Sequence, residues 1–279
     1  MTHSIAMPGR PKDVLVRGAA RAWHVIFILL VAYAVSEVSG FKLTQGLDPE
    51  SRDRLFPIVN ASINAIICLA FVVVVPEFRR SLPILFDKPL VEARASDLTW
   101  AFLSMLCWGC GAYVTAFLAP LMQVKPEWYA LAGFHETAAP ISMRYLAVAF
   151  ASVLLAPIGE ELMYRGFLMN LWAARWGVWG GVIASSIVFG LFHRQNALFA
   201  GVMGLALALV YLKYDSLWPG IAMHAAYNLV VFDPLFGQVV WVKNRAAIQD
   251  LANWIPEMIL TVLFFPVAWQ FWRRFRPAP

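Results

Sequence analysis

Six polar side chains stand in apolar stretches of the chain and could do chemistry there. They are Glu160, Glu161, Arg165, His193, His224 and Asn228. An ionisable group inside a membrane costs about 3 kcal/mol on insertion scales, so such groups are usually paired, turned inward and functional. Carboxylate, imidazole and amide groups together are suited to activating a water molecule and stabilising an oxyanion. The set indicates a hydrolytic reaction centre; the structural alternative is a group of polar contacts that only hold helices together.

The adjacent carboxylates Glu160 and Glu161 are expected to have different roles. Glu161 and Arg165 are spaced i, i+4 with the acid first, which on a helix lets the carboxylate reach the guanidinium. This spacing predicts a structural ion pair. Glu160 points about 100 degrees away on the same helix, so it needs other partners. We therefore expect Glu160 to face a polar cavity as a general base.

The spacing of Glu160 and His193 predicts that they meet. If the chain turns near residues 176–178, both lie roughly 16 positions from the turn, or roughly 24 Å along a helix. In an antiparallel helical hairpin they become neighbours. His224 and Asn228 are spaced i, i+4 and share one face of a later helix.

Metal binding is the alternative for the same side chains. Glu160, His193 and His224 could ligate zinc, with water as the fourth ligand. Their spacing is not that of a His-Glu-x-x-His zinc motif, and the amide of Asn228 is a better oxyanion donor than metal ligand. We therefore expect no cofactor and keep zinc as the alternative.

The elements that position these residues are apolar helices. The 279-residue chain is 61% hydrophobic and 14% charged, with a mean hydropathy of +0.66, which is more apolar surface than one soluble core could hide. Stretches long enough to cross a membrane lie at 23–40, 55–76, 98–120, 142–172, 179–194, 197–212, 217–237 and 254–272. The chain is therefore predicted to be an all-α, polytopic membrane protein of about eight transmembrane helices, with residues 1–279 in a single domain.

The basic residues set the expected orientation. The net charge of +5 could suggest nucleic acid, but in a membrane protein the placement of Lys and Arg carries the information. Alternate loops hold thirteen on one side and eight on the other, and Arg165 lies within a span. The positive-inside rule then places both termini in the cytoplasm of a multi-pass protein of the inner or plasma membrane, with no nucleic-acid partner.

Three short motifs resemble a known family. Glu-Glu-x-x-x-Arg lies at 160–165, Phe-x-x-x-His at 189–193 and His-x-x-x-Asn at 224–228, in that order. Together they resemble the CPBP family of CAAX proteases and bacteriocin-processing enzymes, also called Abi proteins, which includes the Rce1 prenyl endopeptidases. The resemblance places the motif core at residues 142–237.

The resemblance implies a fold and an activity. It implies eight helices around a polar cavity open to the cytoplasm, and a glutamic endopeptidase in which Glu160 and His193 activate water. His224 and Asn228 would stabilise the tetrahedral oxyanion. The expected substrate is a membrane-associated peptide or protein, lipidated or of the leader or signal type.

Two other functions fit the composition. A proton- or cation-coupled transporter would use the carboxylates and imidazoles as a relay across the membrane, and a non-catalytic membrane scaffold would keep the fold alone. No inverted repeat favours a transporter, and the intact polar set argues against a scaffold. The sequence does not predict the oligomeric state or the identity of the substrate.

Overall fold

The computed structural model describes residues 22–118, 150–193, 197–232 and 255–276, and the regular structure within them is helical throughout. The first half of the chain forms α2 (Ala22–Thr44), α3 (Pro49–Val74), α4 (Pro76–Leu85), the short 3-10 turn η1 (Leu90–Glu92) and α5 (Ala95–Leu118). The second half forms η3 (Ala151–Leu155), α7 (Ala156–Glu161), η4 (Leu162–Met169), α8 (Asn170–Phe192), α9 (Ala197–Tyr214), α10 (Leu217–Phe232) and α13 (Ile255–Phe275).

Each of the eight predicted spans has a helical counterpart in the structure. Within the described residues, three segments are long and apolar enough to cross a membrane on their own, namely α2, Val153–Phe192 and α9. The end of α3 (Ser62–Val74) and the segment Pro76–Glu92 meet the same criterion only when taken together, and they are bent by 98°, as in a broken span or a re-entrant loop. The prediction of an all-α polytopic membrane protein is confirmed. Parts of the predicted spans and of the motif core lie outside the described residues, at 119–120, 142–149, 194, 233–237 and 254.

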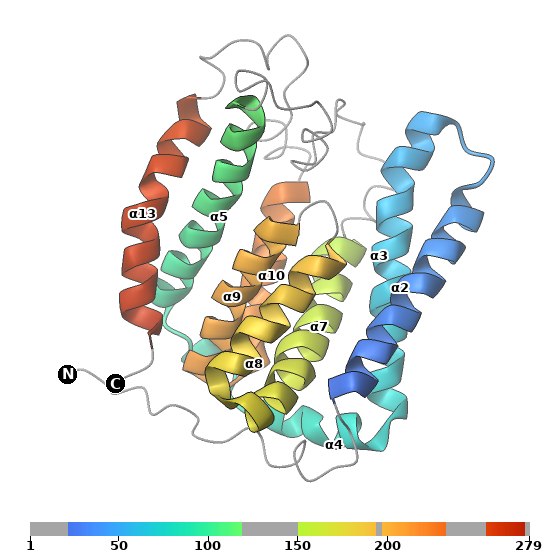
Figure 1. The fold of residues 1–279 in the computed structure, drawn as a ribbon, viewed down its shortest axis with the longest axis horizontal. Coiled ribbons are helices and arrows are strands. Elements are labelled where there is room, and N and C mark those ends of the chain that lie inside the picture. Colours follow the sequence, from blue (N-terminus) through green and yellow to red (C-terminus); the bar gives the residue numbers. More distant parts are fainter. Residues whose placement is uncertain (1–21, 119–149, 194–196, 233–254, 277–279) are drawn as a thin grey trace.

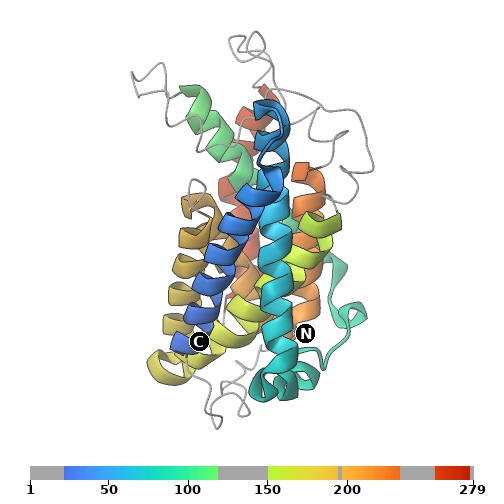
Figure 2. The ribbon, with the colours of Figure 1, turned by 90° about the vertical axis from the view of Figure 1, so that its right-hand side faces the viewer.

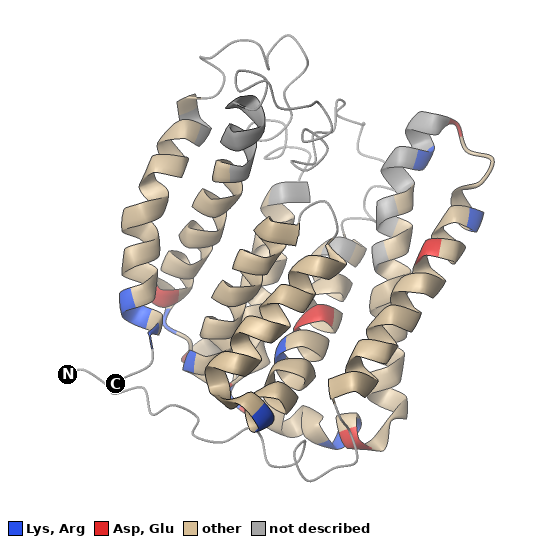
Figure 3. Ribbon diagram, viewed as in Figure 1, with Lys and Arg blue, Asp and Glu red and all other residues tan. Residues whose placement is uncertain are grey.

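The helices are arranged as two outer pairs with a central group between them (Figure 1). α2 packs on α3 at one side, α5 packs on α13 at the other, and α7 to α10 lie between (Figures 1 and 2). Figure 3 shows Lys and Arg at one end of this arrangement, on α4, α8, α9 and α13, with further basic positions toward the other end on α2 and α3 and within the central group. Basic residues at one end are expected of a membrane protein that follows the positive-inside rule.

The helical hairpin predicted around residues 176–178 is present. Gly177 interrupts α8 with φ 78 and ψ 166, a left-handed conformation that favours glycine. The chain reverses there, so the second part of α8 returns along the segment that carries Glu160 and Glu161.

The segment around the two glutamates is not a regular α-helix. The six residues of α7 lie between the π-helical turns η3 and η4. Such wide turns are rare and occur frequently at functional sites. The side chain of Asn170 supports the second turn by donating hydrogen bonds to the carbonyl oxygens of Arg165 and Gly166, each at 2.9 Å.

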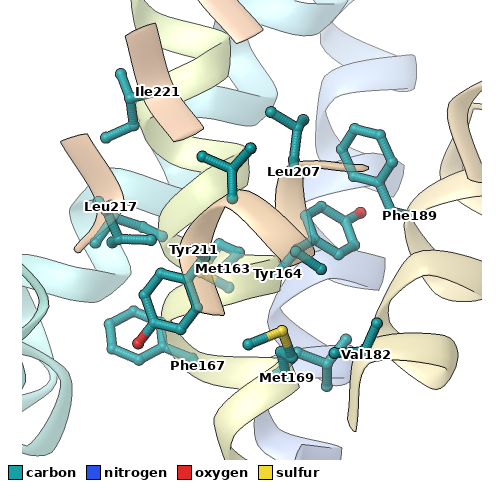
Figure 4. Close-up of a cluster of buried hydrophobic side chains, with 14 of the residues drawn as sticks. Met163, Tyr164, Phe167, Met169, Val182, Phe189, Leu207, Tyr211, Leu217 and Ile221 are labelled. Carbon is teal, nitrogen blue, oxygen red and sulfur yellow. The ribbon is translucent and has the colours of Figure 1, made fainter. Parts of the chain in front are cut away.

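Apolar side chains pack against much of η4. All eight residues of η4 are buried, and its Phe167 stacks on Phe78 of α4 with ring centroids 4.4 Å apart. Figure 4 shows residues of η4 in contact range of α8, α9 and α10, including Phe189, Leu207 and Ile221. This packing fixes the position of the polar residues that the same segment carries.

Candidate active site

A buried ion pair lies at the centre of the molecule. Arg165 Nη1 donates to Glu161 Oε1 at 2.8 Å, as the i, i+4 spacing predicts, and the two side chains are 1% and 0% exposed. Arg165 Nη2 also donates to the carbonyl oxygen of Gly204 on α9, at 3.1 Å. The guanidinium lies 4.4 Å from the ring centroid of Phe189, a cation–π contact. The pair therefore joins η4 to α8 and α9.

His224 extends this pair into a cluster of three charged or polar groups. Its Nδ1 lies 3.1 Å from Glu161 Oε1, and its side chain is 3% exposed. A carboxylate only accepts, so Nδ1 carries the hydrogen of this bond. Glu161 is thus more than the partner of Arg165, because it also orients the imidazole of His224.

The second oxygen of Glu161 is closely confined. Oε2 is buried and has no hydrogen-bond partner among the described residues. A Cβ added at Gly220 of α10 would lie 3.2 Å from this oxygen. The absence of a side chain at Gly220 therefore allows α10 to approach closely enough for His224 to reach Glu161.

Glu160 lies in a different environment from its neighbour. Its Oε2 is 3.9 Å from His193 Nε2 and 3.7 Å from His224 Nε2, and its side chain is 28% exposed. His193 Nδ1 lies 2.7 Å from the carbonyl oxygen of Phe189, which directs Nε2 toward Glu160. The distances to Glu160 are longer than hydrogen bonds, and catalytic contacts often shorten only when substrate binds.

Glu160 and His193 open into a cavity of about 180 Å³. This volume is large enough to admit water molecules. The lining residues come from α2, α3, the α7–η4 segment and α8: Leu29, Tyr33, Asn60, Asn64, Ala65, Cys68, Gly159, Glu160, Met163, Tyr164, Phe192 and His193. A carboxylate and an imidazole on the wall of a polar cavity have access to water, which general-base chemistry requires.

The structure places the predicted site residues in three locations. Glu160 and His193 line the cavity, and His224 lies behind Glu160. Glu161 and Arg165 are buried on the far side of His224. Asn228 lies one turn beyond His224 on α10, half-buried, and is not among the residues that line the cavity.

Sequence reasoning missed the wall formed by α2 and α3. Tyr33, Asn60, Asn64 and Cys68 line the cavity together with Glu160 and His193. The signal was present, because Asn60 and Asn64 are polar residues at i, i+4 inside an apolar span. Uncharged amides cost less in a membrane than ionised groups do, so they stand out less.

A zinc site requires at least three ligand side chains placed around one point. Within the part of the chain that the structure describes, no group of three His, Cys, Asp or Glu side chains is arranged to hold a metal ion. The alternative of zinc at Glu160, His193 and His224 stays a prediction, with a test given below.

Comparison with known proteins identifies the segment that carries the motifs. Residues 142–230 match the family model described as type II CAAX prenyl endopeptidase Rce1-like. Comparison with curated proteins and with solved structures gives no match. The family match confirms the resemblance drawn from the three motifs. The matched segment contains all three motifs and covers less than half of the chain.

Proposed function

We propose that this protein is an intramembrane endopeptidase that uses water activated by Glu160 and His193. The observation that carries the proposal is the position of the Glu160 carboxylate, which lines a cavity and has an imidazole nitrogen on each of two sides at 3.7 and 3.9 Å. The match of residues 142–230 to Rce1-like endopeptidases supports the same reaction class.

In the proposed mechanism Glu160 accepts a proton from a water molecule while the water oxygen attacks the carbonyl carbon of a peptide bond. His193 Nε2 holds the water beside the carboxylate. The tetrahedral intermediate then collapses, its C–N bond breaks, and Glu160 returns the proton to the leaving amine. General-base catalysis of this kind contributes about 10²- to 10⁴-fold to the rate.

His224 and Asn228 are the proposed donors to the oxyanion. Because the Nδ1 proton of His224 is engaged by Glu161, Nε2 donates only when the ring carries both protons. In that form the carboxylate of Glu161, 3.1 Å from Nδ1, would lie behind the charged ring. This arrangement would keep a proton donor beside the reaction centre without a metal ion.

We propose that the cavity acts on a peptide or protein segment held in the lipid bilayer. The substrate class consistent with the family is a chain anchored by a lipid or by an apolar leader or signal segment. The basic residues on α4, α8, α9 and α13 (Figure 3) support an orientation with that end in the cytoplasm of an inner or plasma membrane.

The proposal is tested with purified protein in liposomes and two internally quenched peptides. One carries a farnesylated cysteine followed by three residues, two of them aliphatic, and the other is the same peptide without the farnesyl group. Cleavage of either by the native chain, reduced about 100-fold or more in His193→Ala as general-base catalysis requires, supports the proposal. Equal cleavage by native and His193→Ala protein contradicts it. The ratio of the two peptide rates shows whether a prenyl group is required.

A further inference from the structure

The α3 wall of the cavity faces the proposed reaction centre at close range. Asn60, Asn64 and Cys68 follow one another at i, i+4 and i+8, and all three line the cavity. α3 touches α7 beside them, because a Cβ added at Gly159 would lie 3.5 Å from the Cα of Ala65. Small residues at a helix crossing allow this close approach. The residue before Ala65, Asn64, and the residue after Gly159, Glu160, both line the cavity beside this contact.

The carboxamide of Asn60 already has hydrogen-bond partners within the protein. Its Oδ1 accepts a hydrogen bond from Ser36 Oγ at 2.8 Å, and its Nδ2 donates to Glu37 Oε1 at 2.6 Å. Both ends of the carboxamide are therefore used in joining α2 to α3. Its presence on the wall is explained without a ligand.

Asn64 differs from Asn60 in this respect. Its Oδ1 accepts only the thiol of Cys68, at 3.6 Å, which is a weak donor. Its amide nitrogen donates to no group within residues 22–118, 150–193, 197–232 and 255–276. Asn64 is half-buried and lines a cavity with room for water, so its N–H groups are accessible from the cavity. The donor is thus free for whatever occupies the cavity.

We infer that the Asn64 amide binds a backbone carbonyl oxygen of the substrate peptide, in the cavity that Glu160 and His193 also line. This rests on the proposed peptidase function. In a helical substrate each backbone carbonyl is already bonded within the helix, so only an unwound segment offers one to Asn64. Asn64 therefore selects an extended polypeptide segment and holds its scissile bond between the α3 wall and the Glu160 wall.

The experiment separates binding from cleavage. The probe is a pool of dye-labelled heptapeptides with aliphatic side chains, and its saturable binding is measured by fluorescence anisotropy. The protein carries Glu160→Gln, so no peptide is consumed. In this background Asn64→Ala and Asn64→Leu are expected to weaken binding about 10-fold, which corresponds to about 1.4 kcal/mol for one hydrogen bond. Ile66→Ala on the exposed face of α3 is the matched control and leaves binding unchanged.

A second measurement uses the cleaving protein with Glu160 intact. Asn64→Ala is expected to raise KM about 10-fold with kcat within about 3-fold, as removal of a ground-state contact does. A thermal unfolding curve for each variant shows whether it is folded. If Asn64→Leu does not fold, the test rests on Asn64→Ala, which adds no bulk.

The outcomes of the two measurements distinguish failure of the Asn64 site from failure of the proposed peptidase. Equal binding by Glu160→Gln protein with and without Asn64→Ala contradicts the inference. So does the absence of saturable binding to the folded Glu160→Gln protein. Binding that depends on Asn64, without any Glu160-dependent cleavage of the same pool, supports the peptide site and contradicts the proposed peptidase. Glu160-dependent cleavage with unchanged KM in Asn64→Ala contradicts the inference alone.

Discussion

Glu160 and Glu161 are adjacent in the sequence, yet the structure places them in opposite environments. Glu161 is fully buried and contacts Arg165 and His224 at 2.8 and 3.1 Å. Glu160 is 28% exposed, and its carboxylate lies 3.7 and 3.9 Å from two imidazole nitrogens. The difference shows how one helix can carry both the residue that holds a site together and the residue that meets water.

The largest expected effect is on the activity of the cavity-facing glutamate. Glu160→Gln keeps the shape of the side chain and removes the base, so we expect cleavage to fall about 10³-fold. The thermal unfolding midpoint should stay within about 2 °C of the native value, because Glu160 makes no buried ion pair. Peptide cleavage and thermal unfolding of the same preparation measure both. A large drop in stability with retained activity would reverse the assignment of the two glutamates.

The buried glutamate should respond in the opposite way. Glu161→Gln leaves the guanidinium of Arg165 without its counter-charge in the protein interior, and we expect a loss of about 3 kcal/mol in the free energy of unfolding. Denaturation of the detergent-solubilised protein measures it, with Glu160→Gln as the matched control. An unchanged stability would count against the ion pair.

A smaller effect is expected from a substitution at Gly220, which lies beside the Glu161 carboxylate. In Gly220→Ala the new Cβ would lie 3.2 Å from Glu161 Oε2, and Arg165 and His224 hold that carboxylate in place. We expect a loss of about 1 kcal/mol from overpacking. Gly111→Ala is the control, because its Cβ would meet only Thr261 Cγ2, at 3.7 Å.

At Gly111 the helix propensity of alanine should leave the protein equal or more stable by about 0.5 kcal/mol. If the two alanine variants unfold alike, the close approach of α10 to Glu161 is not a constraint on stability.

The smallest expected effect tests the zinc alternative. Incubation of the purified protein with a strong chelator should leave cleavage unchanged within about 2-fold, because the proposed water is activated by Glu160 and His193 without a metal ion. Loss of activity in chelator that returns on addition of zinc would assign Glu160, His193 and His224 as metal ligands instead.

Local spacing in the sequence predicts part of this arrangement. The i, i+4 pair of Glu161 and Arg165 and the reversal near Gly177 both follow from helix geometry over short distances. The contact of Glu160 with His193 then follows from equal distances to that reversal.

Longer-range contacts could not be predicted in the same way. The contact of His224 with Glu161 joins residues 63 positions apart and depends on how α10 packs on α7, which helical periodicity does not determine. The π-helical turns around α7 leave the apolar pattern intact and so give no sequence signal. The cavity wall of Asn60 and Asn64 comes from α3, far from the motifs in sequence.

The most direct test of the central claim is a comparison of new peptide termini in membranes from cells that contain either the native protein or Glu160→Gln at equal abundance. The account predicts a set of membrane-associated peptide or protein fragments that appears with the native protein and is absent with Glu160→Gln. Identical sets of termini in the two membranes would contradict an endopeptidase that depends on Glu160.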